Sequence, residues 1–269
     1  MKLPGKLTAM AALMAGTAAN GALIVHYTFD GSDATNSGTG PNGTVAGGST
    51  FVPSTAGTNA GQAWAGNRGG GTGADDAHIA VNLTGNDVGM GAAGVYTAMA
   101  WISWAGSGGH VDHMVFGQDD GNPTGNAAQL HHGIRDDSAP NNIHFGGWGG
   151  AQDVSDAGAV PNTGAWTHVA WQYDGTDKVV FVNGAEVTRV AGNNITDPTL
   201  GLLVGGHTRD GNAVNPFHSF NGLLDDVRIY DETLSAAQIT TAMNAVNVPE
   251  PSSMGLLGLA ALGLLRRRR

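Results

Sequence analysis

The chain has 269 residues, of which 44 are glycine, none is cysteine and 13% are charged. This length suffices for one large β-domain or two small ones, and 41% hydrophobic residues argue against a disordered chain. The net charge of −10 is unevenly distributed, because six of the 12 basic residues lie at the two ends. Between the ends, six basic residues stand against 22 acidic ones, a net charge of −16. This balance excludes a surface that binds polyphosphates such as nucleic acids in the middle of the chain.

The first 22 residues have the pattern of a secretory signal. Two lysines precede a small apolar run from Leu7 to Gly16, which is too short to span a membrane stably. Small residues suited to signal peptidase follow, in Thr17-Ala18-Ala19 and Asn20-Gly21-Ala22. We expect residues 1–22 to be a signal peptide; the alternative is an amphipathic first helix of the domain.

The C-terminal end has three parts in order. Pro249-Glu250-Pro251 is followed by an apolar stretch from Met254 to Leu265 and then by four arginines. As a helix, this stretch would rise about 18 Å, short of the roughly 30 Å of the hydrocarbon layer. The arginines would stay cytoplasmic, so the acidic body would face outward. A nucleic-acid-binding tail is the alternative, but the adjacent apolar run favours membrane orientation.

These three parts resemble the PEP-CTERM sorting signal of Gram-negative bacteria. The resemblance implies that residues 248–269 are recognised by an exosortase-type processing enzyme after transient anchoring in the inner membrane. It also implies export to the cell surface or the extracellular space. It says nothing about what the domain binds.

Between the ends, short alternating or apolar runs are separated by Gly, Asn, Asp and Pro clusters, and no long amphipathic helix interrupts them. This spacing predicts an antiparallel sandwich or barrel. Asn183-Gly184 predicts a hairpin, and the one helix expected runs from Ser235 to Met243 with Ser235 as N-cap. The expected strands are 23–29, 77–83, 95–104, 111–117, 129–135, 142–148, 166–173, 178–182, 185–190, 200–205 and 217–230.

Several motifs of the body occur in a recognisable order. The first is His26-Tyr27-Thr28-Phe29-Asp30-Gly31, then come Trp166-Thr167-His168-Val169-Ala170 and finally Asp225-Asp226-Val227-Arg228-Ile229-Tyr230. Together they resemble the laminin-G-like domain of the concanavalin A-like lectin and glucanase superfamily. The resemblance implies an all-β, antiparallel jelly-roll β-sandwich over residues 23–247. The apolar runs at the N- and C-terminal ends add short hydrophobic sorting helices.

A calcium site is expected at the last strand. Alternation there puts Asp225 on the same face as Leu223, Val227 and Ile229, where an unpaired carboxylate is costly. The glucanases that the domain resembles hold a structural calcium at the matching position, which implies Asp225 as a ligand. Further ligands expected are the Asp30 carboxylate and backbone carbonyls of the loop at Asn42 and Gly43. Alternatively, Asp225 caps a loop and Asp30 starts a turn.

Catalysis has less support. Retaining glucanases need two carboxylates about 5 to 5.5 Å apart, typically a Glu pair in the related family. The chain has only Glu186, Glu232 and Glu250, so the paired-Glu motif is absent. The adjacent pairs Asp119-Asp120 and Asp136-Asp137 suit solvated turns better than an acid and a nucleophile.

Ligand contacts are expected from one tryptophan and two basic residues. Trp148 lies among four glycines, which leave its ring accessible for stacking on a sugar. His131 and Arg135 complete the predicted cleft. His110 and His113 could add metal nitrogens, but His131 and His132 point to opposite faces of a strand, so at most one of them could join.

We therefore expect an exported, non-catalytic protein that binds a polysaccharide or another extracellular matrix component. A glycan-active hydrolase or lyase on the same scaffold is one alternative, and a purely structural matrix protein is another. The fold does not decide among them, because this superfamily includes lectins, enzymes and adhesive modules.

Overall fold

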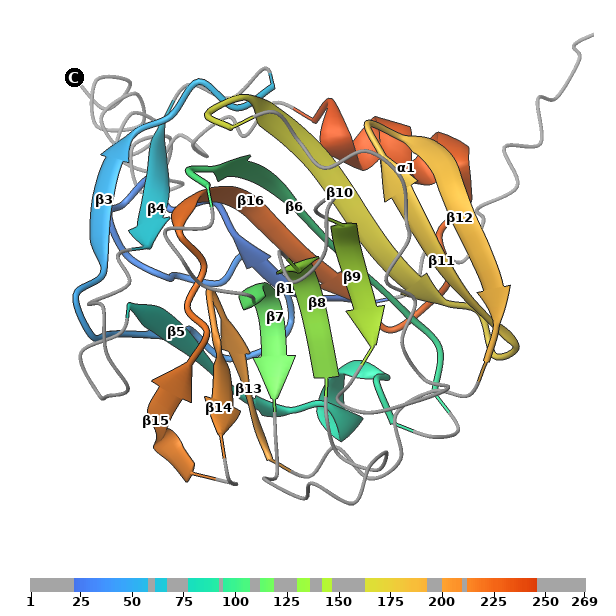
Figure 1. Ribbon diagram of the computed structural model, residues 1–269, viewed down its shortest axis with the longest axis horizontal. Helices are drawn as coiled ribbons and strands as arrows, with labels where there is room; N and C mark the ends of the chain where they lie inside the picture. Colours follow the sequence, from blue (N-terminus) through green and yellow to red (C-terminus); the bar gives the residue numbers. More distant parts are fainter. Residues whose placement is uncertain are drawn as a thin grey trace, which may run out of the picture.

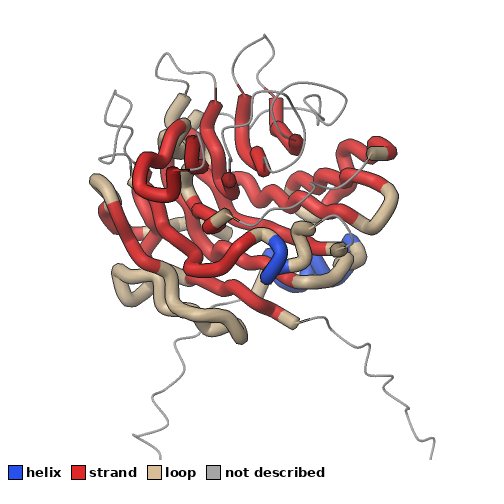
Figure 2. The backbone as a smooth tube through the Cα atoms, turned by 90° about the horizontal axis from the view of Figure 1, so that it is seen from below, coloured by secondary structure: helices blue, strands red, loops and turns tan. Residues whose placement is uncertain are grey.

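The computed structural model describes residues 22–57, 61–66, 77–91, 94–106, 112–118, 130–135, 142–146, 163–192, 200–209 and 212–245. These segments form two antiparallel sheets stacked as a sandwich, with one helix on the outer side of the larger sheet (Figure 1). Figure 2 shows the same two layers from a perpendicular direction. The predicted antiparallel jelly-roll β-sandwich is confirmed.

The larger sheet has the strand order β12-β11-β10-β6-β16-β4-β3, and β1 also pairs with β16. The first strand of the domain is thus hydrogen-bonded to the last one. The strands of this sheet are β1 (Leu23–Tyr27), β3 (Thr50–Pro53), β4 (Gln62–Gly66), β6 (Tyr96–Trp104), β10 (Trp166–Tyr173), β11 (Asp177–Val182), β12 (Ala185–Ala191) and β16 (Gly222–Tyr230).

The smaller sheet has the order β2-β5-β13-β7-β8-β9, and β14 and β15 form a separate two-stranded sheet. The strands of the smaller sheet are β2 (Thr44–Ala46), β5 (His78–Thr84), β7 (Asp112–Gln118), β8 (Leu130–Arg135), β9 (Asn142–Gly146) and β13 (Gly201–Val204). The separate pair consists of β14 (His207–Arg209) and β15 (Asn212–Phe217), and a 3₁₀ turn, η1, spans Asn86–Val88.

All the expected strands are present in outline, but β2, β3, β4, β14 and β15 were not expected from the sequence. The first of them has only three residues, and β15 contains a proline, which argues against a strand assignment in a sequence. The Asn183-Gly184 hairpin is confirmed between β11 and β12. Both residues have positive φ, at 50° and 80°, as such a two-residue turn requires.

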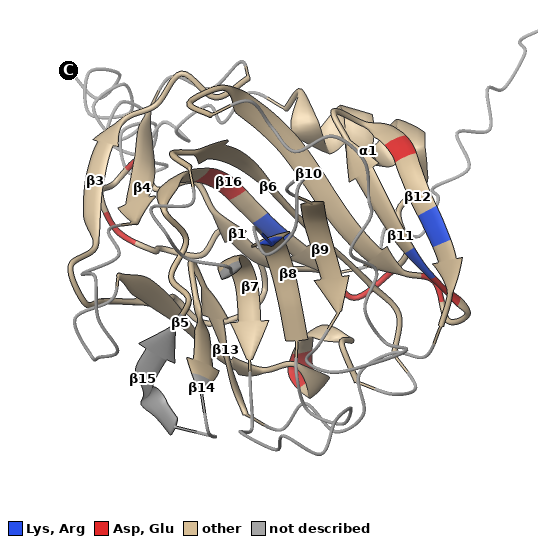
Figure 3. Ribbon diagram, viewed as in Figure 1, with Lys and Arg blue, Asp and Glu red and all other residues tan. Residues whose placement is uncertain are grey.

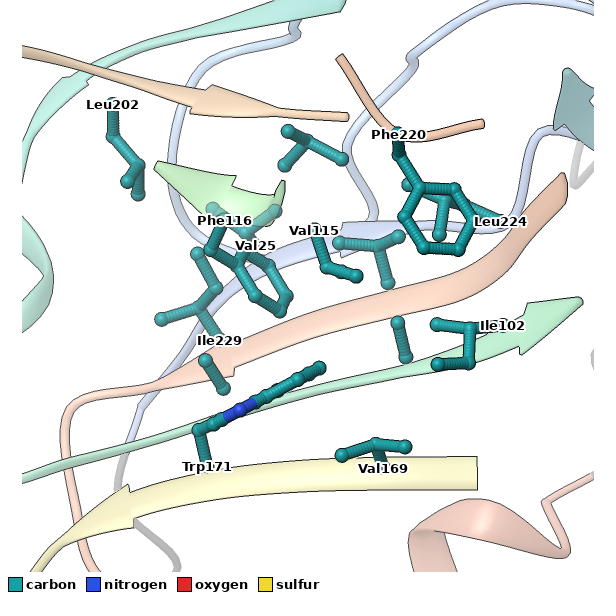
Figure 4. Close-up of a cluster of buried hydrophobic side chains, with 14 of the residues drawn as sticks. Val25, Ile102, Val115, Phe116, Val169, Trp171, Leu202, Phe220, Leu224 and Ile229 are labelled. Carbon is teal, nitrogen blue, oxygen red and sulfur yellow. The ribbon is translucent and has the colours of Figure 1, made fainter. Parts of the chain in front are cut away.

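The core lies between the sheets and is made of alternate residues of their strands. Figure 4 shows Trp171 of β10 and Phe116 of β7 pointing toward each other across the sandwich, with Ile102, Leu224 and Ile229 around them. The two rings meet edge to face at 5.9 Å between centroids. All five side chains are fully buried, so the two sheets share one continuous core.

A β-bulge in β16 corrects the predicted face of Asp225. The pairing of β16 with β6 shifts between Asp225 and Arg228, and Asp226 has a left-handed φ of 49°. Leu224, Val227 and Ile229 therefore face the core, whereas Asp225 lies opposite Trp101 on the outer face of the sheet. The simple alternation that placed Asp225 with Val227 and Ile229 was wrong, because the bulge adds one residue to the strand.

Helix α1 (Ala236–Met243) is where it was predicted. Ser235 and Gln238 form a capping box, and the buried Ile239 packs with Met99 and Leu234 on the outer face of the larger sheet. At the C-terminal end, Arg228 donates to the Ala242 carbonyl and Trp101 Nε1 donates to the Met243 carbonyl at 3.3 Å. Two side chains of the sheet thus bond to carbonyls at the C-terminal end of the helix, where Ala242 also accepts from the Ala245 N–H at 3.2 Å.

The two predicted sorting segments, residues 1–22 and 248–269, lie outside the described residues except for Ala22. The predicted hydrophobic helices at the two ends therefore lie outside them as well. Within the part of the chain that the structure describes, no helix is long and apolar enough to cross a membrane.

Candidate functional site

The outer face of β8 and β9 brings together several of the predicted ligand-binding residues. Alternation along β8 directs His131 and Arg135 outward, while Leu130 and Ile134 enter the core. On β9, Asn142 lies directly opposite Arg135, and His144 is on the same outer face. Arg135 and Asn142 are half-buried, so the part of this face nearest to solvent carries a guanidinium and an amide.

A row of imidazole rings continues this face. The His131 ring lies 6.3 Å from the His144 ring and 4.5 Å from the His207 ring, between centroids, and the His207 ring is 5.0 Å from that of His218. Gly117 is opposite His131, and a Cβ atom there would lie 2.3 Å from the His207 Cβ. Glycine at this position therefore lets the segment of β14 lie directly on the sheet.

The sequence reasoning found His131 and Arg135 but missed His144, His207 and His218. His144 could have been found, because it alternates with Asn142 in a predicted strand. His207 begins β14, which was not predicted as a strand. His218 falls within the predicted strand 217–230, but in the structure it lies between β15 and β16. Trp148 lies outside the described residues.

Three further histidines, His132, His113 and His110, were weighed as metal ligands from the sequence. His132 faces the core, as predicted for the neighbour of His131, and its Nε2 lies 2.7 Å from the Tyr96 hydroxyl. Burial lowers the pKa of His132 to about 3, so the ring is neutral. His113 was considered as a metal ligand, but it packs edge to face against Trp104 of the core, while His110 lies outside the described residues.

A second polar cluster surrounds the bulge of β16, where acidic and basic positions follow one another along the strand (Figure 3). The Asp225 carboxylate accepts hydrogen bonds from the Ser54 hydroxyl and from the Asp226 backbone N–H. Burial raises the pKa of Asp225 to about 7, and the negative charges of Asp226 and Asp30 add to this effect. Asp30 and Asp225, both predicted as calcium ligands, are thus electrostatic neighbours.

The Asp226 carboxylate has side-chain partners on β1 and on β16 itself, and the β1 partner is held in turn by Ser37. His26 Nε2 lies 2.8 Å and Arg228 Nη2 lies 2.9 Å from Asp226 Oδ1, and Ser37 Oγ is 2.7 Å from His26 Nδ1. The Asp226 carboxylate is therefore paired with a buried guanidinium, and its role is to fix β1 and the end of α1 onto β16.

The other two predicted calcium ligands have partners of their own. Asn42 Oδ1 accepts from the Asn36 backbone N–H, the Asn42 carbonyl accepts from Asn82 Nδ2, and the Gly43 N–H donates to the Ala34 carbonyl. These bonds join the loop to its own residues and to β5. Within the described residues, no group of three or more His, Asp or Glu side chains is arranged to hold a metal ion. Oxygen donors for a hard cation are nevertheless present as Asp30, Asp225 and Ser54.

Two stacked antiparallel sheets in a jelly-roll arrangement, with a helix behind the larger one, define a concanavalin A-like β-sandwich. Residues 73–240 match a family model described as the concanavalin A-like lectin/glucanases superfamily, and the chain belongs to this family. Residues 247–269 match the PEP-CTERM protein-sorting motif, which indicates an exported protein with a C-terminal sorting signal. No match to a curated protein was found.

Several solved structures share the fold. Domain 4 of AbnA, an extracellular arabinanase from Geobacillus stearothermophilus in complex with arabinotriose, is 18% identical, with a TM-score of 0.58 over 83% of this chain and 99% of that chain. The binding domain of Paraclostridial Mosquitocidal Protein 1 is 11% identical, with a TM-score of 0.54 over 83% of this chain and 52% of that one. The binding domain of botulinum neurotoxin DC, in complex with SialylT, is 12% identical, with a TM-score of 0.53 over 83% of this chain and 51% of that one. This chain thus spans about half of the two toxin chains, and the likeness shows the fold alone.

Proposed function

We propose that this exported protein is a non-catalytic binding module that recognises a polysaccharide or another component of the extracellular matrix. The observation that carries the proposal is the pair Arg135 and Asn142, which lie opposite each other on the outer face of β8 and β9 and are half-buried. His131 and His144 share this face but are only 3% and 0% exposed, so direct contacts with a sugar are assigned to Arg135 and Asn142. Such hydrogen-bonding groups on a rigid sheet suit sugar hydroxyls, because strands hold them at fixed spacing. Trp148, two residues beyond the end of β9, is the aromatic ring we propose to stack on the sugar.

The structural neighbours support this class of ligand. The arabinanase domain was solved with arabinotriose, and a neurotoxin binding domain with SialylT. We propose the extracellular matrix of the cell surface as the place of action, with a Gram-negative source, exosortase-type processing and transient anchoring in the inner membrane, in keeping with the sorting motif.

A binding role is favoured over a hydrolase for a structural reason. The two adjacent carboxylates at the bulge, Asp225 and Asp226, are only 1% and 2% exposed and are engaged by Ser54, His26 and Arg228. A glycosidase needs an acid and a nucleophile or base facing the scissile bond. Glu186 is paired with Arg189 on an edge strand, far from any second glutamate of the described residues in sequence.

The experiment is a glycan array with the exported protein, comparing the wild type with Arg135→Ala and Trp148→Ala. Binding that is lost in both variants while the melting temperature is unchanged supports the site. The matched control is Arg189→Ala, which removes an exposed arginine from β12 in the other sheet and should leave binding intact. No binding to any glycan contradicts the proposal, and release of sugar from a polysaccharide by the wild type would favour the enzyme.

We also propose that Ca²⁺ binds between Asp30 and Asp225, with a structural role. Both carboxylates and the Ser54 hydroxyl offer oxygen atoms, and a cation would offset the repulsion between the two carboxylates. EDTA should lower the melting temperature, and added Ca²⁺ should restore it. Asp30→Asn should be insensitive to both. A midpoint that does not change with EDTA, together with no heat of Ca²⁺ binding by calorimetry, refutes the site.

A further inference from the structure

The start of the folded domain is fastened to the end of its last strand. Leu23 of β1 pairs with Tyr230 of β16, and the ladder continues for one more residue on each side. The Ala22 backbone nitrogen donates to Asp231 Oδ1 at 2.8 Å, and the Asp231 N–H donates to the Ala22 carbonyl at 3.3 Å. Both backbone groups of Ala22 are therefore used by one acidic residue that lies 209 positions further along the chain.

From the small residues that precede this contact we propose that signal peptidase cleaves the Gly21–Ala22 bond, and from the contact itself that the new α-ammonium group of Ala22 forms an ion pair with the Asp231 carboxylate once the exported domain has folded. In this step water adds across the peptide bond. The bond between the Gly21 carbonyl carbon and the Ala22 nitrogen breaks, Gly21 leaves as a carboxylate, and Ala22 keeps its nitrogen as an ammonium. The cut lies one residue before the boundary that the sequence alone suggested.

The residues before this bond suit the enzyme. Ala19 and Gly21 occupy the third and first positions before the cut, and both are small, as an A-x-A-like site requires. A cut after Ala22 would instead place Asn20, which is larger and polar, at the third position. A cut after Ala19 has small residues in place but leaves the new ammonium two residues away from Asp231.

The three cuts also differ in what they leave at Asp231. Removal of Ala22 takes away both the donor to the carboxylate and the acceptor for the Asp231 N–H. A cut after Ala19 keeps both hydrogen bonds, but the Ala22 nitrogen then donates as a neutral amide. Only cleavage at Gly21–Ala22 gives the bond at 2.8 Å a charged donor as well as a charged acceptor, in a body with many more acidic than basic residues.

The first test is the N-terminal residue of the exported protein. The full chain is produced with its own leader in a Gram-negative host, collected after export, and analysed by N-terminal sequencing and by mass spectrometry of the N-terminal peptide. A mature chain that begins at Ala22 supports the proposal. A start at Asn20 or Leu23 overturns it.

The second test measures the ion pair itself on the exported protein. An N-hydroxysuccinimide ester acylates only unprotonated amines, and an ion pair with Asp231 keeps the Ala22 amine protonated. Asp231→Asn should therefore speed acylation of Ala22 by about 1.4- to 5-fold at pH 7, the range for an exposed pair. Glu232→Gln removes the neighbouring carboxylate, which has no hydrogen bond to Ala22, and should have the smaller effect. Equal rates in the wild type and Asp231→Asn overturn the ion pair.

Discussion

The buried carboxylate of Asp225 makes the stability of the metal-free protein depend on pH. Its pKa rises from 3.8 to about 7 on folding, mainly through burial. A carboxyl group whose folded pKa is raised stabilises the fold fully below its unfolded pKa, and this stabilisation is lost as pH rises through the folded pKa. At about 1.4 kcal/mol per pKa unit, the loss between about pH 4 and pH 7 is on the order of 4 kcal/mol.

Asp225→Asn removes this dependence. The amide keeps an oxygen that can accept from Ser54 or from the Asp226 N–H, but it carries no charge to desolvate. In EDTA, the variant should match the wild type near pH 4 and exceed its unfolding free energy by up to about 4 kcal/mol at pH 7.5. Since Asp225 is also a proposed calcium ligand, added Ca²⁺ should stabilise the wild type and not the variant.

The assay is urea denaturation followed by tryptophan fluorescence at pH 4.0, 5.5 and 7.5, with and without Ca²⁺. A difference between wild type and variant that grows from pH 4.0 to pH 7.5 in EDTA supports the reasoning. Parallel pH profiles would show that the Asp225 carboxylate is not desolvated in the folded state. A variant less stable than the wild type at pH 7.5 in EDTA would show that its hydrogen bonds need the charge.

Three substitutions test the packing around the sheets. Ser235→Ala removes the capping box of α1 and should cost about 1 kcal/mol in chemical denaturation. Gly205→Ala should cost about 2 to 4 kcal/mol, because φ is 79° and the new Cβ would lie 2.3 Å from Trp64 Cη2. Arg228→Met should cost about 3 to 5 kcal/mol, because it leaves the buried Asp226 carboxylate without its guanidinium partner.

Each of these variants has a matched control. Thr241→Ala removes an exposed hydroxyl within α1 and should change stability by less than about 0.5 kcal/mol. Gly164→Ala shares the left-handed φ, at 77°, but no atom lies within 4 Å of its new Cβ, so only the backbone cost of about 1 to 2 kcal/mol remains. Arg189→Met breaks exposed ion pairs and should cost about 1 kcal/mol or less. If a control variant loses as much unfolding free energy as the variant it is matched to, the structural reason given for that variant is wrong.

The sequence predicted the sandwich well because its long strands carry a clear alternation. Trp166–Tyr173 and Tyr96–Trp104 were identified nearly to the residue, and the Asn183-Gly184 turn joined two strands as expected. The short strands could not be found in this way. In Gln62–Gly66 the only large apolar residue is Trp64, and its packing on Gly205 involves a residue about 140 positions away.

Only some residues of the two candidate sites were predicted, because local alternation along a strand determines the positions of only some of them. Asp225 was identified as an unusual buried carboxylate, but its face was wrong because spacing does not reveal a bulge at Asp226. His131 and Arg135 were expected in one cleft, and in the structure alternation along β8 puts both on its outer face. The stacking of His207 on His131 depends on where β14 crosses the sheet, which is a tertiary contact that no local pattern encodes.

The pairing of β1 with β16 also constrains when the protein can fold. The larger sheet is complete only when Leu23–Tyr27 meets Gly222–Tyr230, about 200 residues later. Contacts of such long range form slowly, because a large loop must close before they contribute. If residues 1–22 direct export as the sequence predicts, the first strand crosses the membrane unpaired, and the sandwich can close only after the last strand has followed. In that case the strand order itself favours folding after export of the domain over folding before it.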